Sequence, residues 1–340
     1  MCIRDRSKSN LDNSYKPNDN LLDLFKEDKF LYHLLSKRFS FDESRLITNT
    51  LSKKMFLKII AIRLLPLLTI VFGSILVLRT LWSVLASRKI EWREFKPLDL
   101  DLLDMVLLIS GGFVVLGEVI SPLFSITLVE LVASNLSIEL TQSLKIFFGY
   151  LFMAIPPLLI IYYQIKSFEN KFIFKKDYFQ FNFLPIKDSF IQGFKGFLTI
   201  IPFVLLVSLI MNLLVDNQNG SNPLLEIVLN SNNYISFLLL FLTTTFLAPI
   251  FEEVIFRGVL LPILSREFGI ILGITISALI FALAHLSISE MIPLFILGVG
   301  LGTTRLISGR LSSSVIMHSL WNGMTSVSYT HLTLPTNRCV

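Results

Sequence analysis

A-P-I-F-E-E-V-I-F-R-G-V-L-L, from Ala248 to Leu261, contains two adjacent carboxylates and an arginine inside an apolar run. Moving such a charge into hydrocarbon costs roughly 2.5–3.5 kcal/mol on insertion scales, so ionisable residues in a membrane segment are candidates for function. If the stretch is helical, Glu253 and Arg257 share a face as a favourable i,i+4 pair. Glu252 points about 100° away from Glu253 and lacks that partner. The stretch therefore predicts one neutralised carboxylate and one that is available for chemistry.

The composition is that of an α-helical membrane protein. Of the 340 residues, 53% are hydrophobic and only 16% are charged, whereas a soluble domain has about 25% charged residues. The net charge of +5 is spread over short loops, which fits a bias of Lys and Arg to the inner side of a membrane and argues against nucleic-acid binding. The two cysteines, Cys2 and Cys339, lie at the ends, so neither a disulfide framework nor a Cys-based metal site is expected.

Apolar segments of nearly 20 residues recur along the chain and predict an all-α, polytopic integral membrane protein with about eight transmembrane helices. In chain order they are residues 59–85, 105–132, 146–163, 196–215, 235–264, 270–287, 291–307 and a segment beginning at 311. Prolines are expected to break the second segment at Ser121-Pro122 and to kink the third at Pro156-Pro157. The fifth is expected to bend or loosen at Pro249. Basic loops indicate a cytoplasmic side from the fourth helix onward, and the orientation of the N-terminal side stays open.

We expect the chain to have four parts. These are a polar N-terminal extension (1–54), N-terminal membrane helices (55–233), a candidate catalytic membrane core (234–327) and a C-terminal end (328–340). Residues 1–6 and 328–340 resemble translated adapter sequence, and we expect neither to belong to the fold. Apolar residues between Leu21 and Phe39 predict an amphipathic helix, either on the membrane surface or in solvent.

Two more polar sets accompany the opening stretch. Phe281 and His285 are four residues apart in F-A-L-A-H, and His318 and Asn322 are four apart in H-S-L-W-N, so each pair shares a helix face. Counted from the turn between their helices, Glu252 and His285 lie roughly 22 and 27 Å into the membrane at a rise of 1.5 Å per residue. Three helices are thus expected to bring two carboxylates, two imidazoles and an amide to one buried region.

Each polar residue also has a structural interpretation. A single histidine in a membrane helix most often bonds a neighbouring helix, and Phe281 is expected to pack against its own histidine. Glu118 and Glu130 are expected to be structural or to face water. Gly298 and Gly302 indicate close helix packing. The agreement in depth of the three polar sets is what favours a functional site.

The three sets in this order, E-E-x-x-x-R, F-x-x-x-H and H-x-x-x-N, resemble the motifs of the CPBP family of intramembrane proteases. This family includes the type II CAAX prenyl endopeptidases and the Abi bacteriocin self-immunity proteins. The resemblance covers roughly residues 235–326 and implies a peptidase embedded in the membrane. The site residues that it implies are Glu252, Glu253, Arg257, His285, His318 and Asn322.

Peptide hydrolysis requires an activated water and donors for the developing oxyanion. Glu252 is the candidate base, with His285 expected nearby to share the water's proton. The neighbouring ion pair would fix the local charge, and His318 and Asn322 would donate to the oxyanion. The motifs contain neither serine nor cysteine, which disfavours a covalent acyl-enzyme.

Hydrolysis with no required cofactor is our preferred mechanism, and a zinc-dependent mechanism stays open. Zinc held by Glu252, His285 and His318 would activate the water, but the sequence lacks the H-E-x-x-H spacing typical of zinc peptidases. The expected substrate is a membrane-associated peptide or protein reached from the lipid bilayer of a bacterial inner or other internal membrane. Two other functions stay open: a non-catalytic membrane scaffold of the same family and a proton-coupled transporter.

Overall fold

A computed structural model of the chain describes residues 48–86, 92–95, 100–133, 136–169, 180, 182–214 and 234–333. The chain divides into two compact units, one of which is Thr69–Thr333. The other unit is Met1–Leu68 with Leu334–Val340. Its described residues are the beginning of the helix Thr48–Leu85. The amphipathic helix expected between Leu21 and Phe39 lies outside the described residues.

The described residues form eight helical stretches, and three of the four that precede residue 215 are single helices. They are α3 (Thr48–Leu85), α6 (Ile138–Glu169) and α7 (Ile186–Leu214). Two stretches are composite and contain π-helical segments, labelled η. The first consists of α4 (Leu102–Leu107), η3 (Leu108–Ile120) and α5 (Ser121–Val132). The second, the central run, consists of α9 (Tyr234–Leu242), η4 (Thr243–Leu247), α10 (Ala248–Glu253), η5 (Val254–Leu260) and α11 (Leu261–Phe268). The last three are α12 (Ile270–Ala284), α13 (Ile288–Ser308) and α14 (Leu311–Thr333).

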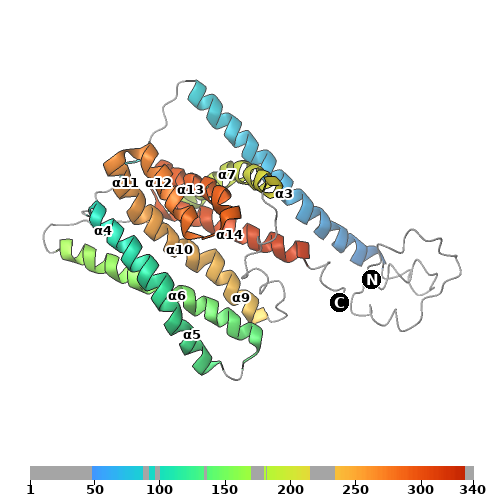
Figure 1. Ribbon diagram of the computed structural model, residues 1–340. Helices are drawn as coiled ribbons and strands as arrows, with labels where there is room; N and C mark the ends of the chain where they lie inside the picture. The colour runs from blue at the N-terminus through green and yellow to red at the C-terminus, as the bar shows by residue number, and fades with distance from the viewer. Residues whose placement is uncertain are drawn as a thin grey trace. The chain divides into compact units, whose positions relative to one another are not determined.

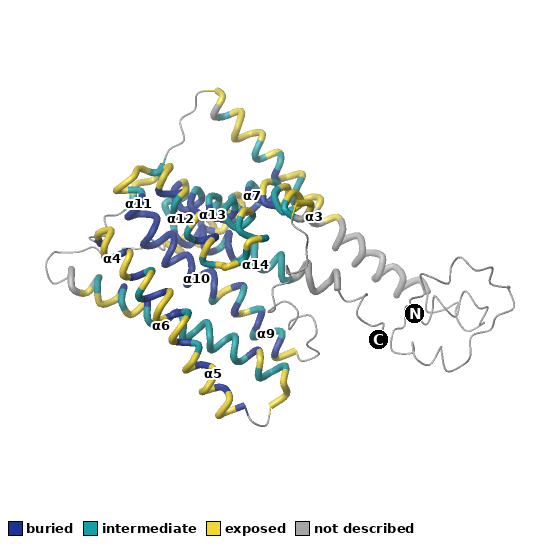
Figure 2. The backbone as a smooth tube through the Cα atoms, in the orientation of Figure 1, coloured by how far each residue is buried: buried dark blue, intermediate teal, exposed yellow. Residues whose placement is uncertain are grey.

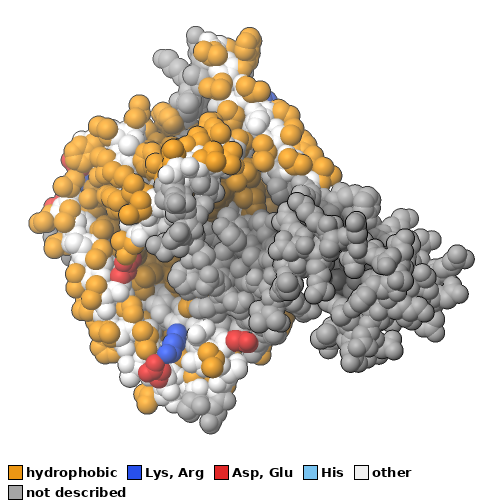
Figure 3. Space-filling view, turned by 45° about the vertical axis from the view of Figure 1, so that its right-hand side comes forward, with side chains coloured by type: hydrophobic (Ala, Val, Ile, Leu, Met, Phe, Trp, Pro, Cys, Tyr) orange, Lys and Arg blue, Asp and Glu red, His pale blue; other side chains and the backbone are white. Residues whose placement is uncertain are grey.

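The protein is an all-α, polytopic membrane protein, as the sequence predicts. Within the described part, five helices are long and apolar enough to cross a membrane: Leu102–Val132, Ile138–Gln164, Ile186–Met211, Tyr234–Phe268 and Ile288–Ser308. Shorter apolar stretches are Leu67–Ser83 and Ile270–Ala284. Hydrophobic side chains cover most of the described surface seen in Figure 3, as a surface in contact with lipid requires.

The central run α9–α11 lies in the middle of the Thr69–Thr333 unit (Figure 1). Helix α6 contacts the run from one side, and η3 and α5 pack against α6. Helices α12 and α14 contact the run as well, and α7 packs against α13 and α14. Figure 2 shows that α10, η5 and most of α11 are buried, whereas α4 to α6 each expose a face. The charged stretch quoted above is therefore the innermost part of the unit.

Each π-helical segment ends two residues before a proline. The capping residue just after the segment donates its N–H to the carbonyl five residues earlier, and a proline follows that residue: Ser121 before Pro122, Ala248 before Pro249, and Leu261 before Pro262. A proline has no N–H, and its ring clashes with the carbonyl four residues back. A widened turn relieves that clash while the helix continues. The loosening expected at Pro249 is thus present, whereas the break expected at Ser121-Pro122 is wrong, since the helix passes through.

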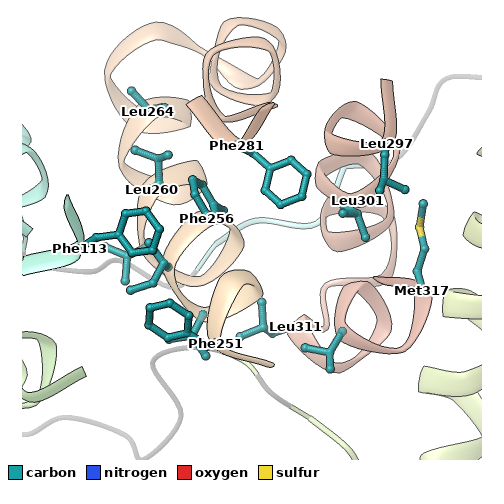
Figure 4. Close-up of a cluster of buried hydrophobic side chains, with 14 of the residues drawn as sticks. Phe113, Phe251, Phe256, Leu260, Leu264, Phe281, Leu297, Leu301, Leu311 and Met317 are labelled. Atoms are coloured by element: carbon teal, nitrogen blue, oxygen red, sulfur yellow. The ribbon is translucent and has the colours of Figure 1, made fainter. Parts of the chain in front are cut away.

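An aromatic cluster holds the central run between its neighbours (Figure 4). The Phe113 ring of η3 lies 5.9 Å from the Phe251 ring and 6.1 Å from the Phe256 ring, measured between centroids. On the other side, Phe256 meets Phe281 of α12 edge to face at 5.3 Å. Contacts of this geometry add about 0.5–1.5 kcal/mol each beyond the burial of their area. The N-terminal helix η3 therefore packs directly on the helix that carries the carboxylates.

Small residues let α13 approach α12, as the glycine spacing predicts. A Cβ atom placed on Gly298 would lie 2.9 Å from the Cβ atom of Ala278, closer than two such atoms can pack. One placed on Gly302 would lie 3.4 Å from Ile274. This close approach at Gly298 brings the backbone of α13 within reach of side chains from the central run.

Candidate active site

A fully buried ion pair lies at the centre of the site. Nη1 of Arg257 donates to Oε1 of Glu253 at 2.8 Å, and both side chains are 0% exposed. Nη2 of Arg257 donates to the Gly298 carbonyl at 3.2 Å, and the guanidinium lies 4.4 Å from the centroid of the Phe281 ring. A buried charge needs a partner of this kind because an unpaired one is strongly destabilising. Glu253 is thus neutralised by Arg257, as their spacing predicts.

His318 connects this ion pair to the second carboxylate. Its Nδ1 atom lies 3.0 Å from Oε1 of Glu253, and its Nε2 atom lies 3.7 Å from Oε2 of Glu252. Because a carboxylate paired with arginine accepts hydrogen bonds, Nδ1 of His318 is the donor, and in the neutral imidazole Nε2 carries the lone pair. The basic nitrogen of His318 therefore points toward Glu252.

Glu252 is nearly buried, and its two oxygens have different surroundings. Its residue surface is 7% exposed. Oε1 accepts a hydrogen bond from the Tyr150 hydroxyl at 3.0 Å. Oε2 is buried and has no hydrogen-bond partner among the described residues. A buried acceptor without a donor is costly, at about 1–3 kcal/mol, so a water or a substrate N–H that donates to Oε2 would be stabilised there.

His285 occupies the edge of the site. It caps the end of α12, where the chain leaves the helix, and its side chain is exposed. Its Nδ1 atom lies 2.8 Å from the Phe281 carbonyl, and its ring lies 4.8 Å from the Phe281 ring between centroids. The Phe281 ring also lies 5.7 Å from the His318 ring. The structure therefore brings His318 next to Glu252, whereas His285 approaches the cluster through Phe281.

The Asn322 side chain donates a hydrogen bond to the Thr244 carbonyl, which Pro249 leaves without a backbone donor. Its Nδ2 atom donates to the Thr244 carbonyl at 2.9 Å. In the widened register of η4, residue 249 would donate to that carbonyl, but residue 249 is a proline and has no N–H. The Asn322 amide supplies the missing donor and ties α14 to η4. Because an amide nitrogen carries two hydrogens, the second remains for another acceptor.

The three residues considered as zinc ligands do not form a ligand set. Within the described ranges, no group of three or more His, Cys, Asp or Glu side chains is arranged to hold a metal ion. His318 directs its Nε2 atom toward Glu252, but His285 lies beyond Phe281. Zinc in catalytic sites takes three protein ligands at about 2.0–2.2 Å. The donor set present here does not match that arrangement.

Two residues from the N-terminal helices reach the site, and sequence reasoning gave them no role in it. Glu118 of η3 is half-buried and interacts electrostatically with both Glu252 and His285. Tyr150 of α6 bonds Glu252 directly. Glu118 carried a signal as an intramembrane carboxylate, but a tyrosine in an apolar helix carries none. Glu130, the other membrane carboxylate, instead pairs with Lys145 at 2.7 Å, and its side chain is 60% exposed.

Comparison with known families gives a match for part of the chain. Residues 234–324 match the family described as type II CAAX prenyl endopeptidase Rce1-like. No curated protein matches the chain, and no solved structure does. The matched segment runs from the start of α9 into α14, so it includes the buried ion pair, Glu252 and His318 but neither Glu118 nor Tyr150.

Proposed function

We propose that this membrane protein is an intramembrane endopeptidase, since residues 234–324 match the type II CAAX prenyl endopeptidase Rce1-like family. Its substrate is a membrane-associated peptide or protein, and the reaction is hydrolysis of a peptide bond by a water that Glu252 activates. The observation that carries this proposal is a pair of acceptors: Oε2 of Glu252, which has no hydrogen-bond partner among the described residues, and Nε2 of His318, which lies 3.7 Å from it.

We place one water molecule against this pair of acceptors. A water has two hydrogens that point in different directions, so it can donate to both Oε2 of Glu252 and Nε2 of His318. In that position, its oxygen lone pairs face away from both residues and toward an incoming carbonyl carbon. As the water oxygen bonds to that carbon, Glu252 takes the proton as general base. The buried surroundings strengthen this transfer because little bulk water screens it.

The tetrahedral intermediate then needs donors and a proton for its leaving group. The second Nδ2 hydrogen of Asn322 is one donor for the oxyanion, and His318 becomes another when the proton taken from the water moves from Glu252 to its Nε2 atom, from which it continues to the leaving group. The proton taken from the water passes to the amine nitrogen as the carbon–nitrogen bond breaks, which leaves one carboxyl end and one amine end. Such preorganised donors are worth about 10²–10³ in turnover when one of them is removed.

The ion pair supports these steps without taking part in them. By accepting from Nδ1 of His318, Glu253 selects the tautomer whose Nε2 atom is basic and fixes the ring's orientation. Arg257 keeps Glu253 ionised so that it remains an acceptor. This arrangement parallels the carboxylate that orients histidine in other hydrolytic sites. Every role named here is filled by residues of the chain, so we propose metal-independent hydrolysis.

A survey of peptide ends tests the proposal. Membranes containing the wild-type protein, membranes containing Glu252→Gln, and membranes without the protein are incubated, and new peptide ends are quantified by mass spectrometry. We expect new ends that appear with the wild type and disappear with Glu252→Gln. If wild type and Glu252→Gln are present as folded protein in equal amount and give the same peptide ends, the protein is not a peptidase that uses Glu252. It is then a transporter if it dissipates an imposed proton gradient, and a scaffold if it does not.

A further inference from the structure

We infer that Tyr150 is a positioning residue of the hydrolytic site: its hydroxyl holds Oε1 of Glu252 so that Oε2 is the oxygen that faces the water. This inference rests on the proposed function and extends it to a helix outside the family segment. Tyr150 belongs to α6 and lies 102 positions before Glu252 in the sequence. The site would then be shared between the family segment and the helices that precede it.

The contact is well placed for this role. Helix α6 packs against α9 and η4, the part of the central run just before Glu252. Tyr150 is partly buried there, and its hydroxyl oxygen lies 3.0 Å from Oε1 of Glu252. Among the described residues, this is the one hydrogen bond to the Glu252 carboxylate. Without it, both carboxylate oxygens would be free to exchange places by rotation about the terminal side-chain torsion.

The direction of the bond is fixed by its surroundings. The hydroxyl of Tyr150 is within electrostatic range of two carboxylates, Glu252 and Glu118. Ionised carboxylates are acceptors only, so the phenol must donate its hydrogen. It donates to Glu252. A bond to an ionised acceptor is shorter and stronger than a neutral one, which suits it to orient a carboxylate in a membrane interior.

The competing explanation is that Tyr150 only tethers α6 to the central run. In that case its loss would lower stability and leave the turnover of folded protein unchanged. Tyr150→Phe separates the two, because it removes a single oxygen and keeps the ring. The same change at Tyr163 is the matched control, since Tyr163 lies on the same helix, is 64% exposed, and lies outside the site.

The test uses the full-length protein in lipid vesicles and a quenched fluorescent peptide spanning a cleavage position found in the survey of peptide ends. For Tyr150→Phe we expect kcat to fall by about 10- to 100-fold, the range that a misplaced reacting group gives, with KM within about twofold of wild type. Tyr163→Phe should match the wild type in both. The melting temperature of each variant in the same vesicles is measured alongside.

A second comparison tests whether Tyr150 affects turnover through the Glu252 carboxylate. Aspartate at position 252 is one methylene shorter and withdraws the carboxylate from the Tyr150 hydroxyl. Adding Tyr150→Phe to Glu252→Asp should therefore lower kcat by less than about twofold, because the two changes disrupt one unit. A wild-type kcat in Tyr150→Phe, or an unchanged kcat together with a lower melting temperature, would overturn the inference and leave the proposed function intact. Equal rates for wild type and Glu252→Gln would overturn the proposed function and this inference with it.

Discussion

Nδ1 of His318 lies 3.0 Å from Oε1 of Glu253, the same oxygen that accepts from Arg257 at 2.8 Å. One carboxylate oxygen therefore serves both the cation and the imidazole. The consequence is that the other imidazole nitrogen points toward Glu252. Two carboxylates that are adjacent in the sequence thus have different surroundings: Glu253 is paired with Arg257 and orients the histidine, whereas Glu252 has no arginine partner and accepts from the Tyr150 hydroxyl. The predictions below follow from this difference.

The two carboxylates should respond differently to the same substitution. Glu252→Gln keeps an acceptor for Tyr150 and removes the base, so we expect turnover to fall by about 10²–10⁴ with the fold retained. Glu253→Gln leaves the guanidinium of Arg257 buried without an anionic partner, which should cost about 3–5 kcal/mol of stability as well as activity. Thermal unfolding and yield in detergent, measured beside turnover, check this. Equal loss of yield in the two variants would contradict the assignment.

The two histidines provide an internal comparison. His318→Gln removes the basic nitrogen that faces Glu252 and should lower turnover by about 10²-fold or more. His285 is exposed and lies beyond Phe281, so His285→Gln should have a clearly smaller effect. Turnover of both variants, normalised to the amount of folded protein, shows which of the two histidines is the partner of Glu252. A larger loss at His285 would show that His285 is the partner of Glu252 and that the geometry described here is not the active one.

Asn322 should contribute to both structure and catalysis. Asn322→Ala removes the donor to the partly buried Thr244 carbonyl, and leaving such a carbonyl unsatisfied costs up to about 1–3 kcal/mol. If its second amide hydrogen stabilises the oxyanion, turnover of the folded fraction should also fall by about 10²–10³ with substrate affinity little changed. The two effects are separated by measuring turnover at a temperature where the variant is fully folded. Near-normal turnover under those conditions would leave Asn322 with the structural role alone.

Removal of metal ions should leave the activity in place. The described residues contain no metal-ligand group of three, and each proposed step uses a side chain of the protein. After dialysis against a strong chelator, we expect turnover within about twofold of the untreated sample and less than one zinc per ten protein molecules by elemental analysis. Activity that is lost on chelation and restored by added zinc would show that zinc is required.

A methyl group at Gly298 should disturb the site from a distance. A Cβ atom there would lie 2.9 Å from that of Ala278, so Gly298→Ala must push α13 away from α12 and with it the carbonyl that accepts from Arg257. Overpacking of this kind costs about 1–3 kcal/mol. Gly111→Ala is the control, because nothing lies within 4 Å of a Cβ at that position. Melting temperatures should fall for the first variant and not for the second.

Spacing along single helices predicted much of this arrangement from the sequence. The i,i+4 rule gave the Glu253–Arg257 pair and placed His318 and Asn322 on one face, and the loosening at Pro249 followed from its missing N–H. Contacts between helices could not be predicted in this way. Periodicity defines which side chains share a face but not the rotation of one helix against another. For that reason His285 was expected beside Glu252, where the structure has His318, and Tyr150 was not identified.

Oxygen-isotope labelling tests most directly whether Glu252 makes water attack a peptide bond. Purified wild type and Glu252→Gln are incubated with the fluorescent peptide in water enriched in oxygen-18, and the products are examined by mass spectrometry. The proposed mechanism predicts that wild type produces a new carboxyl end containing one oxygen-18 atom, and that Glu252→Gln produces it at least about 100-fold more slowly. Labelled product forming at the same rate with both proteins would contradict the central claim.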